Sequence, residues 1–284
     1  MLAGKAHVSP VKFPEEIQLL IARRQASGDT PLKSRFVSVI EPYKGVAFIA
    51  SCTALPLTSG SGTAVEVKRT SGETDLILHD PTQSKKTLGD TASDAHSAVI
   101  TRDASGKVRR IFFAGGTFLT IGKQTWRSAP LKGVVTAVDP QKRFVTVRLE
   151  NDGKESADLD GRIVHFGNDL RQTAHPVLSS KRNGTLLTLT TKDDLFVGRI
   201  PVKVVKDKTI TSAVNLPLAP TYTGTSLCGV NFAEWQTVQS ADATTITLRA
   251  APKNVSVGKD LWIVNIAPGD RFEVPSQFAK TMEI

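Results

Sequence analysis

Two histidines and two aspartates lie close enough in the sequence to suggest a divalent metal site. They are Asp75, His79, Asp80 and His96, and imidazole and carboxylate groups are common metal ligands. However, Asp75 and His79 are four residues apart on a predicted strand, so they lie about 13 Å apart along it. His79 and Asp80 are adjacent and point to opposite faces. We therefore expect polar groups at strand ends, and we predict no metal site and no cofactor.

A catalytic nucleophile or a phosphate-binding loop would also need a characteristic local pattern. The chain has no Gly-x-Ser-x-Gly sequence, and Ser226 and Cys228 lie in a β-like segment without a following helix. The glycines of residues 59–62 are followed by a predicted strand rather than by Gly-Lys-Ser/Thr, which excludes a P-loop. The sequence therefore does not support a hydrolase or a nucleotidase, and we predict no catalytic residue.

Glu41 and Tyr43 end a stretch, residues 34–45, that predicts a β-strand leading into a Glu-Pro-Tyr corner. A phenol has an ordinary pKa of about 10 and needs nearby positive charge to act as a base. We instead expect Glu41 and Tyr43 to anchor the strand exit by hydrogen bonds, with Pro42 fixing the bend.

Positive charge is concentrated in one part of the chain. The formal net charge is +9, and residues 101–150 hold ten Lys and Arg against three Asp and Glu. Arg102, Arg109 and Arg110 flank a predicted hairpin there. Such a basic field favours an anionic partner, with a solvated strand face as the alternative. The apolar run 111–116 fits a core strand better than a base-stacking platform, so an acidic glycan is favoured over nucleic acid.

The elements that must position these residues are almost all predicted strands, so the expected fold class is all-β. Short hairpin linkers predict an antiparallel β-sandwich over residues 34–130, incomplete or supersandwich-like. The remaining residues 1–33 form a predicted connector, within which only residues 14–25 have helical spacing. The expected sandwich strands are residues 46–57, 64–69, 74–78, 97–102 and 108–114.

A repeated pattern follows residue 130. Residues 134–166 and 235–264 each contain strand, polar turn, strand, loop and strand, and residues 186–205 form a more divergent copy. One such unit cannot bury its apolar face alone. We therefore predict a smaller β domain of repeated units over residues 131–284.

Cysteine usage and hydropathy leave the compartment open. Cys52 and Cys228 fit no Cys-x-x-Cys pattern, so we expect two buried free thiols, with a long-range disulfide as the alternative. No run approaches the roughly 18 apolar residues of a membrane span, and the first residues lack the apolar region of a secretory signal.

Four segments in order are similar to the C-terminal β region of heparinase II/III-like polysaccharide lyases. They are Phe-Val-Ser-Val-Ile-Glu-Pro-Tyr at 36–43, Thr-Asp-Leu-Ile-Leu at 74–78, Gly-Gly-Thr-Phe-Leu-Thr-Ile-Gly at 115–122 and Gly-Asp-Arg-Phe-Glu-Val-Pro at 269–275. The resemblance implies a periplasmic or secreted protein that acts on acidic polysaccharides by β-elimination, in a cleft between an N-terminal α/α toroid and the β region.

The resemblance also implies which chemistry to expect here. In that family a carboxylate neutraliser, a His and a Tyr carry the reaction, and much of this set belongs to the toroid, whereas this chain has at most one predicted helix. We therefore expect a non-catalytic portion, whose toroid is either a separate partner or missing, that contributes a basic cleft wall through Arg102, Arg109 and Arg110. A stand-alone carbohydrate-binding or cell-surface structural module is the alternative, and enzymatic activity stays an open question.

Overall fold

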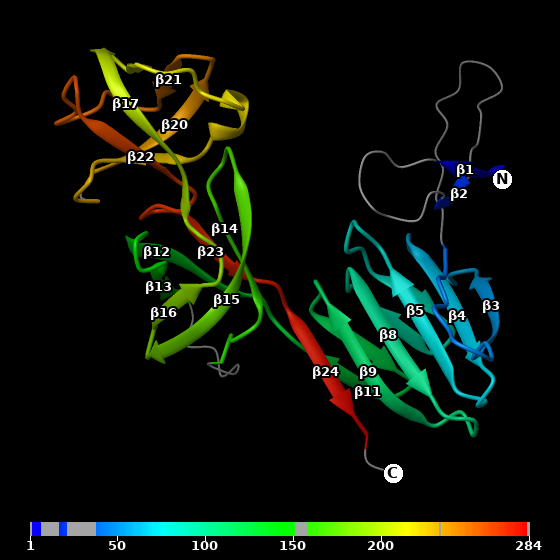
Figure 1. The fold of residues 1–284 in the computed structure, drawn as a ribbon. Helices are drawn as coiled ribbons and strands as arrows, with labels where there is room; N and C mark the ends of the chain where they lie inside the picture. Colours follow the sequence, from blue (N-terminus) through cyan, green and yellow to red (C-terminus); the bar gives the residue numbers. More distant parts are fainter. Residues whose placement is uncertain (1, 7–16, 22–37, 151–157, 233, 283–284) are drawn as a thin grey trace.

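The computed structural model describes residues 2–6, 17–21, 38–150, 158–232 and 234–282. Their regular structure is β throughout, apart from one 3-10 turn at Ala219–Tyr222, so the all-β prediction is confirmed (Figure 1). In this part of the chain no helix is long and apolar enough to cross a membrane.

The first two strands, β1 (Leu2–Ala6) and β2 (Ile17–Ile21), form an antiparallel pair. The helix predicted for residues 14–25 is therefore wrong for Ile17–Ile21, and its other residues lie outside the described ones. A segment this short gains little from a helix, whose first turn is costly to form. The β-branched residues at its two ends also favour a strand once a partner strand supplies hydrogen bonds.

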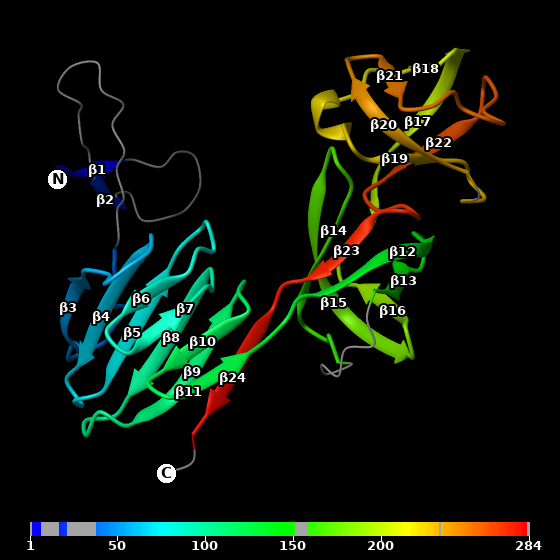
Figure 2. The same cartoon turned by 180° about the vertical axis from the view of Figure 1, so that it is seen from behind.

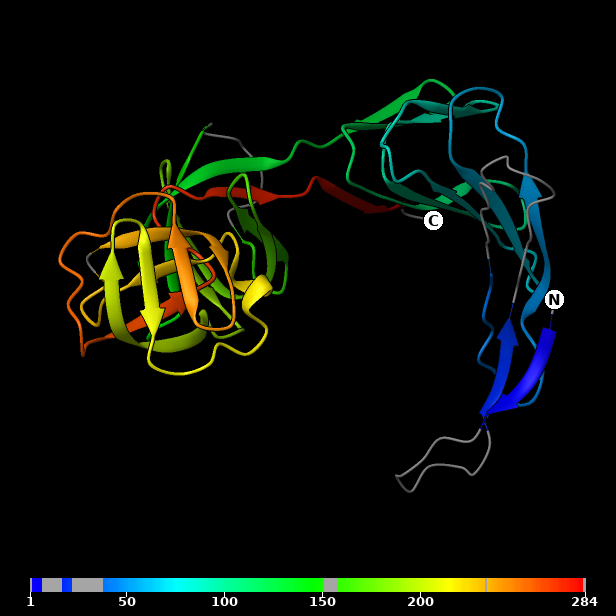
Figure 3. The same ribbon diagram turned by 90° about the horizontal axis from the view of Figure 1, so that it is seen from above.

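The next part of the chain forms two antiparallel sheets that face each other as a sandwich (Figures 1 and 3). The larger sheet has the order β24-β9-β8-β5-β4-β3, and the smaller has the order β11-β10-β7-β6. The strands of the larger sheet are β3 (Ile49–Leu55), β4 (Thr63–Arg69), β5 (Thr74–His79), β8 (Ser97–Arg102), β9 (Val108–Ala114) and β24 (Gln277–Thr281). The strands of the smaller sheet are β6 (Lys86–Leu88), β7 (Thr91–Ser93), β10 (Phe118–Ile121) and β11 (Gln124–Arg127).

The core of the sandwich follows from the alternation of side chains along each strand. Leu78, Ala98 and Phe113 are register partners across β5, β8 and β9 and are fully buried. Leu119 and Ile121 of β10 pack against them from the facing sheet. Residues one step further along each strand point away from this core, which creates a distinct outer face on the larger sheet.

The strand predicted over residues 34–45 is not present in its described part. Residues 38–48 are irregular, and Ile40 and Val46 are 85% and 89% exposed. The alternation of apolar and polar residues is suitable for a strand, but no described strand pairs with this segment. Regular pairing begins only at Ile49, where β3 forms the edge of the larger sheet.

Two small antiparallel barrels follow the sandwich in the sequence. The first closes in the order β12-β13-β16-β15-β14-β23, and the second in the order β17-β18-β21-β20-β19-β22 (Figure 2). The strands of the first are β12 (Leu131–Asp139), β13 (Phe144–Leu149), β14 (Ile163–Gly167), β15 (Gln172–Asn183), β16 (Leu186–Thr191) and β23 (Arg271–Val274). Those of the second are β17 (Phe196–Lys206), β18 (Thr209–Ser212), β19 (Ser226–Cys228), β20 (Trp235–Ala241), β21 (Thr245–Leu248) and β22 (Asp260–Val264).

The two barrels share one strand topology and are nested in the chain. When the strands of each barrel are numbered in chain order, both close as 1-2-5-4-3-6. The second barrel is inserted between β16 and β23 of the first, and both barrels lie between β11 and β24 of the sandwich. The repeat is therefore a whole barrel, in which β12–β13 corresponds to β17–β18. The predicted match of residues 134–149 with residues 235–249 pairs β12–β13 with β20–β21 and is therefore wrong, because antiparallel hairpins share the same alternation.

Both cysteines are free, as expected, but only one of them is buried. Cys228 packs into the core cluster of the first barrel, and this burial raises the pKa of its thiol to about 12. Cys52 is exposed on β3, so the expectation that both thiols are buried is wrong for this residue. The cause is its place on an edge strand, which no further described strand covers.

One buried polar cluster fixes the loop between β5 and β6. Asp80 is 1% exposed, and its carboxylate accepts hydrogen bonds from the Ser61 hydroxyl at 3.0 Å and from the backbone N–H and hydroxyl groups of Thr82 and Ser84 at 2.5 to 3.2 Å. Burial alone raises the pKa of Asp80, but these hydrogen bonds outweigh it and hold the pKa below its ordinary value. The fully buried Lys86 amine donates to the Ala95 carbonyl at 2.6 Å.

Replacement of Asp80 by Ala is expected to destabilise the fold by roughly 3 kcal/mol, because it leaves several buried donors without an acceptor. Urea unfolding followed by circular dichroism measures this change in the free energy of unfolding. Glu150→Ala removes an exposed carboxylate and should stay within about 0.5 kcal/mol of the parent. Equal effects of the two substitutions would contradict the structural role of Asp80.

A buried histidine makes the stability of the first barrel depend on pH. His175 is 4% exposed, its Nε2 lies 3.1 Å from the Thr173 hydroxyl, and its Nδ1 has no hydrogen-bond partner among the described residues. Its Nδ1 lies 3.9 Å from the Asp193 carboxylate. Burial lowers the pKa of His175, and this effect exceeds the opposing effect of Asp193.

We expect the free energy of unfolding to decrease as the pH falls below about 6.5, the ordinary His pKa. The unfolded chain then binds a proton that the buried imidazole of the folded chain resists, so lower pH favours unfolding. Urea unfolding across this pH range measures the slope. His175→Gln should reduce the slope, while His165→Gln on the neighbouring strand retains it because His175 is still present. A parent and a His175→Gln variant with the same slope would contradict this assignment.

Candidate functional site

The four residues considered as metal ligands do not converge. The rings of His79 and His96 contact each other with centroids 4.6 Å apart, and both Nδ1 atoms lie within 3.3 Å of the Ser97 hydroxyl. The Asp80 carboxylate accepts hydrogen bonds from its own loop, and the Asp75 carboxylate pairs with Arg69. Within the described ranges there is no group of three or more His, Cys, Asp or Glu side chains suited to a metal ion.

The Glu-Pro-Tyr corner is anchored by its glutamate. The Glu41 carboxylate accepts hydrogen bonds from the backbone N–H groups of Phe48 and Ile49, both at 2.6 Å, and so fixes the approach to β3. Tyr43 is 58% exposed, and its phenol makes no hydrogen bond to another described residue. The anchoring role expected for this corner therefore holds for Glu41 and not for Tyr43.

The three arginines predicted to bind substrate have different surroundings at the β8–β9 hairpin. Arg109 forms a two-point ion pair with Asp103, with nitrogen to oxygen distances of 2.6 and 2.7 Å. Arg102 donates to the Gly106 carbonyl at 3.2 Å. Arg110 is exposed and makes no ion pair with a described residue. Two of the three arginines thus stabilise their own hairpin, and only Arg110 is free to meet a ligand.

A β-bulge explains why adjacent arginines differ. The register shifts between Thr101 and Arg102, so Thr101 pairs with Arg110, Arg102 pairs with Val108, and Arg109 is the extra residue. Asp103 receives further hydrogen bonds from Ser105 and from the Lys107 backbone. The Ser105 hydroxyl makes the largest contribution, and together these groups lower the pKa of Asp103 to about 2. The hairpin therefore presents Asp103 as a carboxylate to Arg109.

Arg110 belongs to the outer face of the larger sheet, opposite the sandwich core. In one row across this face Ile77, Val99 and Phe112 are register partners. In the next row Asp75, Thr101 and Arg110 are partners. These residues line a hollow of about 390 Å³, here called the outer-face hollow, which also touches β24. Its floor is apolar, and polar groups gather at one side.

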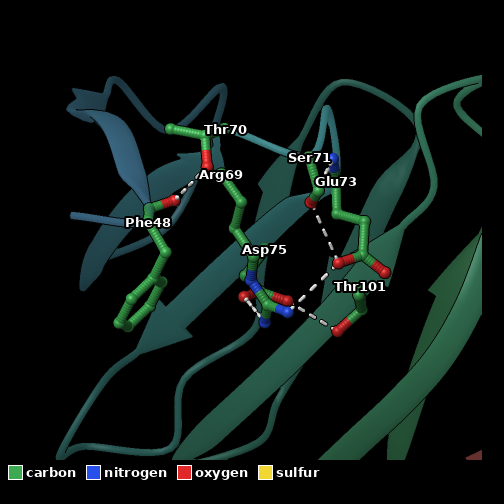
Figure 4. Close-up of polar contacts among 7 residues, drawn as sticks. All are labelled: Phe48, Arg69, Thr70, Ser71, Glu73, Asp75 and Thr101. Atoms are coloured by element: carbon green, nitrogen blue, oxygen red, sulfur yellow. Dashed lines mark hydrogen bonds and ion pairs between the residues drawn. The ribbon is translucent and has the colours of Figure 1, made fainter. Parts of the chain in front are cut away.

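The polar side of the hollow is held by a network around Asp75 (Figure 4). The Arg69 guanidinium donates to one carboxylate oxygen of Asp75 at 2.5 Å, and the Thr101 hydroxyl donates to the other at 2.6 Å. Arg69 also reaches the Glu73 carboxylate at 3.3 Å, and Ser71 donates to the same carboxylate. The hydrogen bond to Asp75 is the main cause that raises the pKa of Arg69. In this network Arg69 pairs with two carboxylates, whereas Arg110 makes no ion pair with a described residue.

The outer-face hollow combines one free guanidinium with an apolar floor that contains an aromatic ring. A guanidinium matches the two oxygens of a carboxylate or a sulfate. The ring of Phe112 can pack against the apolar face of a sugar. The arrangement suits binding of an anionic ligand with a flat apolar side. Among its described lining residues there is neither a His nor a Tyr that could transfer a proton.

Sequence reasoning identified Arg110 but missed the partners that define its surroundings. Burial of Ile111 and Phe113 places Arg110 and Phe112 on the other face by simple alternation, so this pair could have been found. Arg69 and Asp75 are six positions apart in the sequence. The residues of β24 and β9 that pair beside the hollow are more than 160 positions apart. No local pattern indicates either.

Comparison with known protein families, curated proteins and solved structures gives no match for this chain. Its function must therefore be argued from the geometry of its own residues.

Replacement of Arg109 by Ala is expected to lower the melting temperature by a few degrees, because it removes the ion pair that closes the β8–β9 hairpin. Arg110→Ala removes an exposed guanidinium on the outer face of the same strand and should leave the melting temperature unchanged. Differential scanning calorimetry compares the two variants. An equal loss in both would show that the arginines do not have the separate roles described above.

Proposed function

We propose that this chain binds an acidic polysaccharide without cleaving it, as a non-catalytic β portion of a heparinase II/III-like polysaccharide lyase. The observation that carries the proposal is the placement of Arg110 beside Phe112 in the outer-face hollow. These residues are two apart on β9, so they share one face of the strand. The chain adds a net charge of +9, which favours approach of a polyanion.

The size and composition of the hollow fit a sugar unit that carries an acidic group. Its volume of about 390 Å³ lies within the range of small-ligand sites, roughly 300 to 1,000 Å³. Arg110 supplies the contact to the carboxylate or sulfate, and Ile77, Val99 and Phe112 supply apolar contact to the ring. The hollow lies on the outer surface of the sheet, where one unit of a longer polymer can reach it.

The lining of the hollow supports binding rather than catalysis. β-Elimination needs a group that neutralises the uronate, a base for the sugar proton and an acid for the leaving oxygen. The described lining contains no His or Tyr, and the Asp75 carboxylate is already engaged by Arg69 and Thr101. Tyr43 is exposed at the approach to β3 and is absent from the described lining.

Arg110→Gln is expected to weaken binding of heparin-type oligosaccharides roughly tenfold, the loss of one charge-assisted contact of about 1.4 kcal/mol. Isothermal titration calorimetry at low salt measures the dissociation constant. Binding by the parent should also weaken as salt is added, because exposed charges are screened.

Arg148→Gln is the matched control, since it removes one exposed positive charge from β13 of the first barrel. If both substitutions weaken binding equally, general charge rather than the hollow is responsible. Unsaturated uronate, detected by its ultraviolet absorbance after incubation with the pure chain, would overturn the non-catalytic assignment. Binding of a neutral glycan that is unaffected by Arg110→Gln would favour a stand-alone carbohydrate-binding module.

A further inference from the structure

A separate cavity lies where the sandwich meets the first barrel. Two stretches of chain connect these parts, one between β11 and β12 and the other between β23 and β24 (Figures 1 and 2). The cavity, here called the junction pocket, has a volume of about 400 Å³ and is lined by residues of both connections and of the adjoining strands. It shares no lining residue with the outer-face hollow.

The junction pocket carries positive charge without a compensating acid. Arg127 ends β11 and is exposed, while Arg162 precedes β14 and is partly buried. One nitrogen of Arg162 donates to the Pro275 carbonyl at 3.0 Å, which holds this side chain against the connection. The described lining contains no Asp or Glu, and neither arginine forms an ion pair with a described residue. The described lining of the pocket therefore carries two positive charges and no negative one.

The apolar lining of the pocket comes from two different cores. Leu159 and Val274 belong to the core of the first barrel and are each 2% exposed. Leu131 packs against that same core, whereas Phe278 packs against the core of the sandwich. A bare inorganic ion would leave this apolar surface in contact with water. An anion with a compact apolar body would cover it and gain from its burial.

Hydrogen bonds fix the chain connections beside the pocket. The Ser276 hydroxyl accepts from the Gly116 N–H at 2.9 Å and donates to the Gly116 carbonyl at 2.5 Å. The Ser128 hydroxyl donates to the Gln277 carbonyl at 3.1 Å, which joins the β11–β12 connection to the start of β24. A side chain at position 116 would meet the Ala95 backbone at 2.3 Å, so the close approach requires glycine there. Because these hydrogen bonds already order the chain here, ligand binding costs less conformational entropy.

We propose that the junction pocket binds a compact organic carboxylate, with the carboxylate between Arg127 and Arg162 and the apolar body against Leu131 and Phe278. The two guanidinium groups supply recognition of the carboxylate oxygens. The apolar wall selects a ligand with a ring or a short aliphatic body. The ligand contacts both the sandwich and the barrel, so it stabilises their mutual arrangement as well as occupying the site.

Titration calorimetry on the full chain tests this proposal with phenylacetate as the probe and benzyl alcohol as its neutral counterpart. Phenylacetate is expected to bind and to raise the melting temperature, because it binds only the folded chain. Benzyl alcohol should bind at least tenfold more weakly. Arg127→Gln and Arg162→Gln are each expected to weaken phenylacetate binding at least tenfold, while Arg148→Gln leaves it unchanged.

Two further arms separate the possible sources of the carboxylate. Binding of glucuronate or of a uronate oligosaccharide with the same dependence on Arg127 assigns the pocket to the end of a polysaccharide, and binding of phenylacetate alone assigns it to a free organic acid. The Arg127 side chain is exposed and makes no hydrogen bond with a described residue, so its variant remains informative if Arg162→Gln unfolds. Absence of binding by every carboxylate up to millimolar concentrations, or binding unaffected by Arg127→Gln, would overturn the proposal. The Arg110→Gln variant retains the junction pocket, so failure here is distinguishable from failure at the outer-face hollow.

Discussion

The pairing of β24 with β9 is the contact on which the arrangement of the whole chain depends. Both barrels are inserted between β11 and β24, so this one ladder brings the end of the chain back to a sheet formed by its first half. The same ladder places Thr281 opposite Arg110 at one end and Phe278 beside the junction pocket at the other. Such a long-range contact is entropically costly to form and is expected to be made late in folding.

Nested insertion is compatible with stability because each inserted unit closes on itself. A closed barrel satisfies its backbone hydrogen bonds internally and leaves no edge strand. The second barrel therefore needs only two chain ends close together, which β16 and β23 of the first barrel provide. The sandwich is different, since β3 remains an edge and displays the exposed Cys52. Its integrity depends on the facing sheet and on β24. The two barrels share part of a core, since Cys228 and Val264 of the second barrel belong to the core cluster of the first.

Much of the fold could be predicted from sequence because alternation of apolar residues has a local cause. The strands Thr74–His79, Ser97–Arg102 and Val108–Ala114 match their predicted ranges closely. Alternation does not indicate whether a partner strand exists, and so the strand predicted for residues 38–48 is absent from the structure. It also cannot identify which hairpins belong to one barrel. For the candidate site, Arg110 could be predicted from the sequence. The different surroundings of Arg109 and Arg110 depend on a β-bulge that no sequence pattern indicates.

Net charge alone is a poor guide to where this protein meets an anion. Arg69 and Arg109 each pair with an aspartate, and such pairs contribute little to the field that a ligand experiences. The informative feature is a guanidinium without an acidic partner beside apolar surface, where lower local polarity strengthens its attraction for an anion. Arg is suited to this setting because its planar, weakly hydrated group tolerates contact with apolar neighbours better than an ammonium does. Arg110 above Phe112 and the arginines of the junction pocket meet this condition, which is why position relative to apolar surface, rather than the number of basic residues, selects them.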